Sequence, residues 1–207
     1  MPPRFLYFDL GNVLITFCND RMVRQMAGVA RMSEEQVRDV LAIHSTSGVQ
    51  WRFEAGQITP DAYYQTLAEA AGWAPPRGAL ELACCDIFGR IDGSLHLVTE
   101  LAAAGHRLGI LSNTNAVHWP FLTDGRFPEL NDAFELHVTS FGAGAMKPDP
   151  RIYHYAAERA GVPATELFFV DDRADNVAGA LQVGVDAVRF TSTGQLERDL
   201  RDRGIAW

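Results

Sequence analysis

The chain has 207 residues, of which 47% are hydrophobic and 21% are charged, and its formal net charge at pH 7 is -8. This length permits one sizeable core, or a core domain with a modest insert. The negative charge argues against broad electrostatic attraction to nucleic acid or to an anionic membrane surface. The sequence shows no signal peptide and no apolar run of the ~20 residues that cross a bilayer. Three cysteines without a Cys-x-x-Cys spacing favour the cytoplasm.

The first predicted element is a strand at Arg4–Asp9, a short apolar run that ends in a carboxylate. Such runs are typical of buried strands in parallel sheets. From residue 16 to residue 92 the chain shows helical patterns, such as Ser33–Ile43 and Pro60–Ala71, and no convincing strand. Ser33 begins a capping box with Gln36. We therefore expect a helical insert, or cap, at 16–92 between two parts of a core domain, 1–15 and 93–207.

Strands and helices alternate after the insert. The predicted strands are His106–Ser112, Glu135–Ser140, Leu167–Val170 and Val185–Phe190, and the predicted helices are Ser94–Ala104, Pro150–Ala160 and Ala174–Val183. Asp149 and Pro150 are favoured at a helix start, and Gly161 at a helix end. The alternation predicts an α/β fold with a doubly wound parallel sheet.

Polar residues follow four of these segments, namely Asp9, Ser112-Asn113, the Lys147 loop and Asp171-Asp172. Ligands of open α/β sheets bind beyond the carboxyl ends of the strands, so we expect these residues to converge. A carboxylate can attack phosphorus, and hard oxygen ligands suit Mg²⁺. A hydroxyl and an ammonium can hold phosphate oxygens.

These four segments resemble the motifs of the haloacid dehalogenase superfamily, in the same order and over almost the whole chain. They are Phe8-Asp9-Leu10-Gly11-Asn12-Val13, Leu111-Ser112-Asn113-Thr114, Met146-Lys147-Pro148-Asp149-Pro150 and Phe168-Phe169-Val170-Asp171-Asp172. The Leu-Gly-Asn-Val form of the first motif and the segment 171–176 are similar to the branch with bacterial sugar-phosphate phosphatases.

The resemblance implies a role for each matching residue. Asp9 would be the nucleophile and, with Lys147, would carry the catalysis. Mg²⁺ would be bound by Asp9, the carbonyl of Gly11 and Asp172, with Asp171 acting directly or through water. The phosphate would be held by Ser112, Asn113 and Lys147, and Asn176 would support the acidic loop.

Gly11 departs from the family pattern, because most phosphatases of the superfamily carry there a second Asp that protonates the leaving oxygen. General acid-base catalysis is typically worth about 10²–10⁴-fold in rate. Three alternatives follow: a good leaving group, a substitute from water or from His44, Arg52 or Tyr63 in the insert, or very slow hydrolysis. We expect Trp51, Phe53, Tyr63 and Tyr64 to pack within the insert rather than stack on substrate.

The preferred interpretation is a Mg²⁺-dependent phosphatase that hydrolyses a small phosphorylated metabolite, with sugar phosphates as candidates, through a phospho-Asp9 intermediate. One alternative is a metal-independent 2-haloacid dehalogenase with the same nucleophile. Another is a catalytically weak binding or regulatory protein on the same fold. The expected partner is a small phosphate ester, and neither nucleic acid nor membrane.

Overall fold

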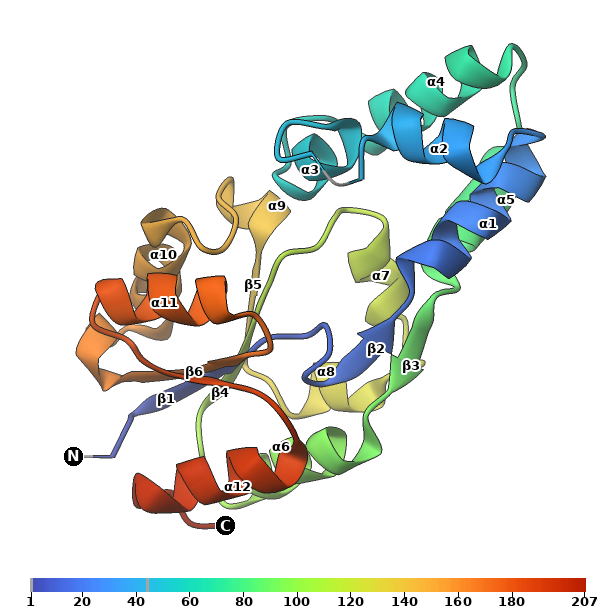
Figure 1. Ribbon diagram of the computed structural model, residues 1–207. Helices are drawn as coiled ribbons and strands as arrows, with labels where there is room; N and C mark the ends of the chain where they lie inside the picture. Colours follow the sequence, from blue (N-terminus) through green and yellow to red (C-terminus); the bar gives the residue numbers. More distant parts are fainter. Residues whose placement is uncertain (1, 44) are drawn as a thin grey trace.

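The centre of the molecule is a five-stranded parallel sheet with the strand order β5-β4-β1-β6-β7 (Figure 1). The computed structural model describes residues 2–43 and 45–207. The strands of the sheet are β1 (Phe5–Phe8), β4 (Leu108–Ser112), β5 (Leu136–Thr139), β6 (Leu167–Asp171) and β7 (Asp186–Arg189). The first strand of the chain thus lies in the middle of the sheet, and the predicted doubly wound α/β fold is confirmed.

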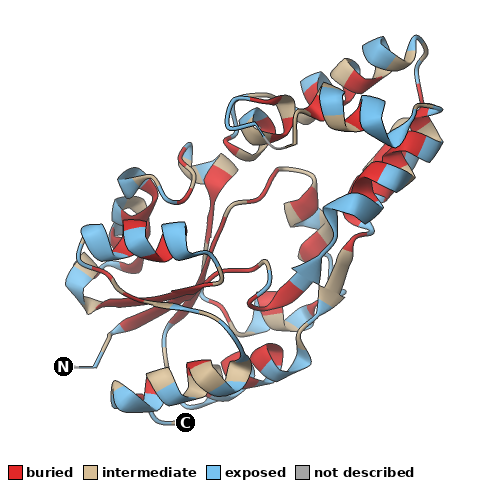
Figure 2. Ribbon diagram, in the orientation of Figure 1, coloured by how far each residue is buried: buried red, intermediate tan, exposed pale blue. Residues whose placement is uncertain are grey.

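Helices cover both faces of this sheet, because successive strand residues point to opposite sides. On β1, Leu6 and Phe8 face an apolar cluster that includes residues of the helices Asp92–Ala103 (α6) and Thr193–Asp202 (α12), whereas Phe5 and Tyr7 face a second cluster with the helices Pro150–Ala160 (α10) and Ala174–Gln182 (α11). The sheet is buried on both sides (Figure 2). The elements of this part are α6 (Asp92–Ala103), α7 (His118–Leu122), α8 (Pro128–Asp132), α9 (Ser140–Ala143), α10 (Pro150–Ala160), the 3-10 turn Ala164–Glu166, α11 (Ala174–Gln182) and α12 (Thr193–Asp202).

The ends of α10 follow the predicted signals. The side chain of Asp149 accepts a hydrogen bond from the Arg151 amide, and Pro150 occupies the first turn. Gly161 ends the helix with a φ of 67°, in the left-handed region that glycine adopts without a Cβ penalty. The predicted helix Pro150–Ala160 therefore has the observed bounds.

Among the residues that the structure describes between β2 and β3, five helices form the helical insert, which extends away from the sheet (Figure 1). They are α1 (Asn19–Ala30), α2 (Glu34–Leu41), α3 (Val49–Glu54), α4 (Pro60–Ala71) and α5 (Arg77–Cys85). The insert has its own buried cluster, in which the rings of Phe53 and Tyr63 stack at 4.4 Å between centroids. Phe53, Tyr63 and Tyr64 pack as expected, but Trp51 is only half-buried.

A two-stranded antiparallel ribbon connects the insert to the sheet, and the prediction of no strand between residues 16 and 92 is wrong. The ribbon consists of β2 (Ile15–Phe17) and β3 (Phe88–Arg90), with Thr16 opposite Gly89. Each strand has three residues, too few for an alternating pattern to emerge. Their pairing also joins segments some seventy positions apart, which local sequence cannot show.

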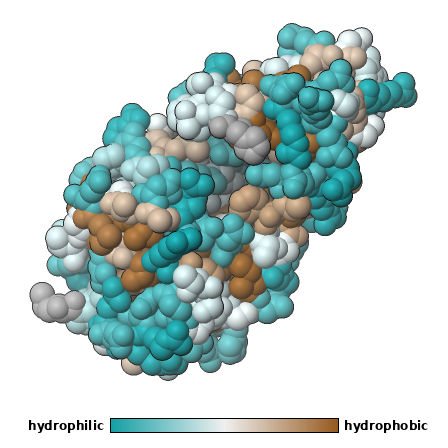
Figure 3. Space-filling view, in the orientation of Figure 1, coloured by the Kyte–Doolittle hydropathy of each residue, from teal (hydrophilic) through white to brown (hydrophobic). Residues whose placement is uncertain are grey.

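The outer surface is predominantly hydrophilic on the face shown in Figure 3, with apolar patches between the polar regions. Among the residues that the structure describes, none of the helices has the length and apolar character needed to cross a membrane.

Candidate active site

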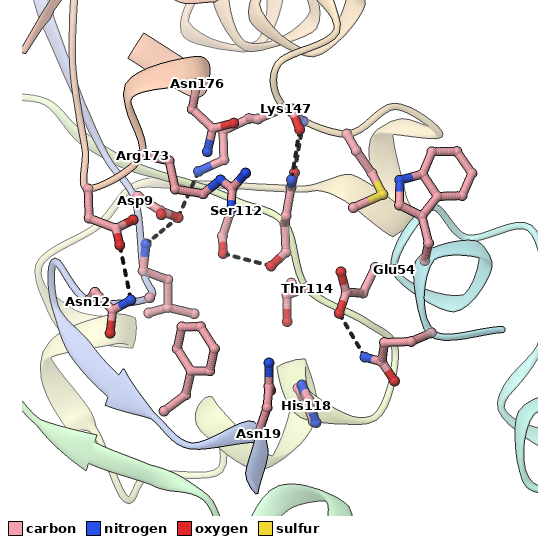
Figure 4. Close-up of a pocket in the computed structure, with 18 of the residues that line it drawn as sticks. Asp9, Asn12, Asn19, Glu54, Ser112, Thr114, His118, Lys147, Arg173 and Asn176 are labelled. Atoms are coloured by element: carbon pink, nitrogen blue, oxygen red, sulfur yellow. Dashed lines mark hydrogen bonds and ion pairs between the residues drawn. The ribbon is translucent and has the colours of Figure 1, made fainter. Parts of the chain in front are cut away.

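The four predicted strand-end segments meet at the carboxyl edge of the sheet, around an open cavity of about 480 Å³ (Figure 4). Asp9 follows β1, and β4 and β6 flank β1 directly, so Ser112 and Asp171 lie on neighbouring strands. Lys147 comes from the loop between α9 and α10. Because the cavity is lined from the insert as well, both parts of the chain contribute to one site.

Lys147 occupies the centre of this arrangement. Its Nζ lies 2.7 Å from Asp9 Oδ1 and 2.7 Å from Asp171 Oδ2, and it donates to the Leu111 carbonyl oxygen at 2.8 Å. All three protons of the ammonium therefore have an acceptor. Lys147 is buried, and it is the only lysine in the chain; the other 17 of the 18 basic residues are arginines.

Burial and the neighbouring charges act together on the pKa values of the cluster, and the pKa of both Asp9 and Lys147 lies above its usual value. Burial raises the pKa of the Asp9 carboxyl; the Lys147 ammonium opposes this shift and the Asp171 carboxylate adds to it. Burial lowers the pKa of Lys147, but the two carboxylates raise it above its usual value, so the ammonium stays charged. Carboxylate oxygens of Asp9, Asp171 and Asp172 lie within 4.8 Å of one another. Three carboxylates face one ammonium, which leaves an excess of negative charge.

The two members of the acidic pair differ in environment. Asp171 is fully buried, and both of its oxygens accept from the Asn176 amide at 3.0 Å, while the Arg173 backbone amide donates to Oδ1. Asp172 is half-buried, lines the cavity and accepts from Asn12 Nδ2 at 3.0 Å. The Asp172 carboxylate is therefore the more available of the two. Asn176 contacts Asp171, the contact that its predicted supporting role requires.

The second motif contributes a hydroxyl and a clamp. Ser112 is buried at the end of β4 and lines the cavity. The Asn113 side chain accepts from the Lys147 amide at 2.8 Å and donates to the Lys147 carbonyl oxygen at 3.0 Å. This amide is thus committed to the backbone of the Lys147 loop, and Asn113 can reach a phosphate only through its own backbone. Gly179 on α11 lets the same loop approach, since a Cβ there would lie 2.6 Å from the Pro148 carbonyl oxygen.

Gly11 lines the cavity beneath the ring of Phe17 on β2. A Cβ at position 11 would lie 2.9 Å from Phe17 Cε1, closer than real carbon contacts allow. The space that a longer side chain would need is therefore held by an aromatic ring. A side chain at position 11 would require the exposed Phe17 ring to move, and as glycine this position leaves the first motif without an acid-base group.

Of the substitutes predicted for that group, neither Arg52 nor Tyr63 lines the cavity, and His44 falls outside the described residues. Arg52 is exposed, and the fully buried Tyr63 donates its hydroxyl to Gln50 Oε1 at 2.8 Å. Glu54, at the end of α3, does line the cavity and was missed. A glutamate on a short helix has the sequence signature of a solvated surface charge.

The family of the chain follows from comparison with known proteins. The model of the haloacid dehalogenase-like hydrolases matches residues 7–184. The chain therefore belongs to this family of hydrolases, as its four motifs and its fold indicate.

Particular relatives give a closer comparison. The chain is 24% identical to a D-ribitol-5-phosphate phosphatase of Bacteroides thetaiotaomicron over 87% of this chain and 88% of the relative. It is 30% identical to the chloroplast flavin mononucleotide hydrolase 1 of Arabidopsis thaliana over 56% of this chain, a match that spans 46% of that relative. A crystal structure of a HAD family enzyme from Bacteroides thetaiotaomicron with magnesium and inorganic phosphate superposes with a TM-score of 0.80. It is 26% identical, and the match covers 91% of this chain and 94% of the other.

Proposed function

We propose that this hydrolase is a Mg²⁺-dependent phosphatase that acts on a small phosphorylated metabolite through a phospho-Asp9 intermediate. One observation carries the proposal: three carboxylates from the ends of two neighbouring strands, β1 and β6, gather within 4.8 Å of one another, around a buried ammonium in the cavity. A phosphate ester needs a nucleophile, a cation to offset the negative charges and donors for its oxygens. The cluster offers all three kinds of group.

The residues present fit a hard divalent cation. Mg²⁺ prefers carboxylate, carbonyl and water oxygens, and the cluster carries more negative charge than Lys147 neutralises. Asp9, Asp172 and the Gly11 carbonyl would hold the ion, with Asp171 binding directly or through water. When bound, the ion would offset the repulsion between the Asp9 carboxylate and the substrate phosphate.

Asp9 is oriented for attack by its neighbours. Asp9 Oδ1 accepts a hydrogen bond from the Leu10 amide at 2.7 Å and contacts Lys147. Asp9 Oδ2 has no hydrogen-bond partner among the residues that the structure describes, so it is the oxygen available for attack. In the proposed reaction an Asp9 oxygen bonds to phosphorus while the ester oxygen departs and takes up a proton. Water then attacks phosphorus, the Asp9–phosphorus bond breaks, and inorganic phosphate leaves. The Ser112 hydroxyl would hold a phosphate oxygen through both steps, and Lys147 would offset the phosphate charge and exchange one of its three present contacts for a phosphate oxygen.

The helical insert would serve as the cap of this site, with residues 16–92 as the cap and 1–15 and 93–207 as the core. The cavity is lined by residues of α3 as well as by the strand ends, which supports a substrate enclosed between the two parts. Such enclosure excludes bulk water and selects by size. The full-length similarity to a ribitol-phosphate phosphatase makes sugar and polyol phosphates the first substrates to test.

The test is a screen of sugar, polyol and nucleotide phosphates, with and without Mg²⁺, that measures released phosphate. Asp9→Asn should abolish turnover, while Asp39→Asn, an exposed carboxylate on α2, should leave it unchanged. Full activity of Asp9→Asn would refute the phospho-enzyme mechanism. Halide release from 2-haloacids that survives chelation would instead support the dehalogenase alternative.

A further inference from the structure

The proposed reaction needs an acid for the leaving oxygen, and position 11 cannot supply it. The other ionisable groups around the cavity are mostly committed to partners. Asp175 pairs with Arg173 at 2.6 Å. His118 has Nδ1 against the Asn115 amide and Nε2 against Cys84, and burial lowers its pKa to about 4. Glu54 remains as a cavity carboxyl without an ion-pair partner among the described residues.

Glu54 has one oxygen fixed and one oxygen open. Its Oε1 accepts from Gln50 Nε2 at 2.7 Å, and Tyr63 donates to Gln50 Oε1 at 2.8 Å, so the Gln50 amide is held with its nitrogen toward the carboxyl. Oε2 has no hydrogen-bond partner in the described part of the chain. The side chain is drawn in Figure 4 on the insert side of the cavity that Asp9 and Ser112 also line. The fixed amide thus leaves Oε2 to act on a ligand.

The end of α3 is anchored to the core, although it belongs to the insert. Ser140 Oγ, in α9 directly after β5, donates to the Glu54 carbonyl oxygen at 2.6 Å. Gly56 packs against the same helix: it has a φ of 69°, and a Cβ there would lie 2.6 Å from the Phe141 carbonyl oxygen. These two contacts fix the Glu54 backbone relative to the sheet that carries Asp9.

The protonation state of Glu54 suits proton transfer near neutrality. Burial raises its pKa to about 7, and the hydrogen bond from Gln50 opposes this shift. A general acid works best when its pKa is near the working pH. The helices α2, α4 and α9 pack on α3. Tyr63 of α4 is the ionisable group among them whose charge interacts with that of Glu54, and α9 presents the Ser140 hydroxyl. The charged groups of the core that line the same cavity are Asp9, Lys147, Asp172, Arg173 and Asp175.

We propose that Glu54 is the general acid-base residue of this site, replacing the acid that is absent at Gly11; this rests on the proposed phosphatase function. In the first step, an Asp9 oxygen bonds to phosphorus, the bond to the ester oxygen breaks, and the Oε2 proton of Glu54 passes to that oxygen to release an alcohol. In the second step, the Glu54 carboxylate takes a proton from water as the water oxygen bonds to phosphorus. The Asp9–phosphorus bond breaks, which releases phosphate and restores Asp9 and protonated Glu54.

The test compares two esters of similar size and different leaving group, p-nitrophenyl phosphate and benzyl phosphate, in the wild type and in Glu54→Gln. The glutamine keeps an acceptor for Gln50 and loses only the transferable proton. Because benzyl alkoxide needs that proton, kcat/KM for benzyl phosphate should fall by about 10²–10⁴-fold. For p-nitrophenyl phosphate, whose phenolate is a stable anion, kcat/KM should fall only a few-fold.

Two further readouts separate catalysis from a structural role. Glu54→Gln should show a rapid burst of p-nitrophenolate followed by slow turnover, since water attack on phospho-Asp9 loses its base. The wild-type decline of kcat/KM for benzyl phosphate above about pH 7 should disappear in the variant. Glu69→Gln, an exposed carboxylate of α4, is the matched control and should behave as the wild type.

Each outcome bears on the proposal. Equal losses of kcat/KM on both esters, or full retention on benzyl phosphate, would overturn the role of Glu54 while leaving the phosphatase function intact. If the wild type, in the same way as Asp9→Asn, hydrolysed neither these esters nor any metabolite of the screen, both the role of Glu54 and the phosphatase function would be overturned. Selective loss on benzyl phosphate together with the burst would establish Glu54 as the proton donor.

Discussion

Replacing Lys147 by methionine should strongly destabilise the protein. The substitution removes the ammonium group that lies 2.7 Å from both Asp9 and Asp171. The two carboxyl groups then remain buried beside each other without a positive charge between them. Removing one partner of a buried ion pair typically costs 3–5 kcal/mol, because the remaining charge is buried without compensation. For a chain of this length, 1 kcal/mol corresponds to roughly 2–4 °C in Tm, so we expect a decrease of about 6–20 °C.

The loss should depend on pH in a defined direction. Burial already raises the folded-state pKa of Asp9 above the value of an unfolded chain, and removing the ammonium raises it further. A group of this kind contributes stability below its unfolded pKa and loses it as the pH rises through the folded pKa. The stability difference between Lys147→Met and the wild type should therefore be larger at about pH 8 than at about pH 5.

The assay is urea-induced unfolding followed by circular dichroism, with Mg²⁺ present and after chelation. Because a bound cation would partly replace the missing ammonium, added Mg²⁺ should narrow the difference. Arg198→Met, which removes an exposed cation, is the matched control and should stay within about 0.5 kcal/mol of the wild type. A Lys147→Met protein within about 1 kcal/mol of the wild type at about pH 8 would refute the reasoning.

Three further substitutions, Gly179→Ala, Tyr63→Phe and Glu54→Gln, test the packing and protonation around the site, with Gly78→Ala as a control away from it. Gly179→Ala should lower the free energy of unfolding by about 1–3 kcal/mol, because the added methyl group would collide with the 146–149 loop. Gly78→Ala has open space around it and should instead stabilise its helix by about 0.5–1 kcal/mol. The denaturation midpoints of the two variants, each measured against the wild type, test this difference. Tyr63→Phe should cost about 1–3 kcal/mol because a buried amide oxygen loses its donor, and an unchanged midpoint would contradict this. Glu54 has a folded pKa raised to about 7, so its contribution to stability is present at acidic pH and lost as the pH rises through that value. The Tm of Glu54→Gln relative to that of the wild type should therefore rise from about pH 5 to about pH 8. A difference in Tm that stays constant over this range would contradict the raised pKa of Glu54.

Those parts of the fold and of the site that depend on local patterns could be predicted from the sequence. β1 and β6 are short apolar runs bounded by carboxylates, and parallel strands place their carboxyl ends at one edge. That rule predicts that Asp9 and Asp171 lie at one edge, whereas the role of Lys147, in the loop between α9 and α10, was indicated by the resemblance of its motif. The bounds of α10 follow in the same way from its capping residues.

The features that sequence reasoning missed depend on contacts between distant segments. The β2–β3 ribbon pairs residues on either side of the helical insert. Glu54 reaches the cavity only because α3 docks on Ser140, and no local pattern encodes that contact. The sequence predicts that Asn113 holds phosphate but does not show that its side chain is engaged with the backbone at Lys147, which leaves the Asn113 backbone for that role. These features require the folded chain, since each is set by which segments meet in three dimensions.

Of the 18 lysine and arginine residues in the chain, 17 are arginines. The single lysine, Lys147, stands where three acceptors converge on one nitrogen. A guanidinium spreads its donors over a planar fork, whereas an ammonium directs three protons from one compact centre. Because the chain has a single lysine, this side chain can be labelled selectively and observed by NMR spectroscopy. Protein produced in cells supplied with ¹⁵N-lysine would carry a single labelled side chain. Its Nζ resonance would report on the position between Asp9 and Asp171. Substrate, phosphate or metal arriving there could be followed through one signal, with no other lysine to assign.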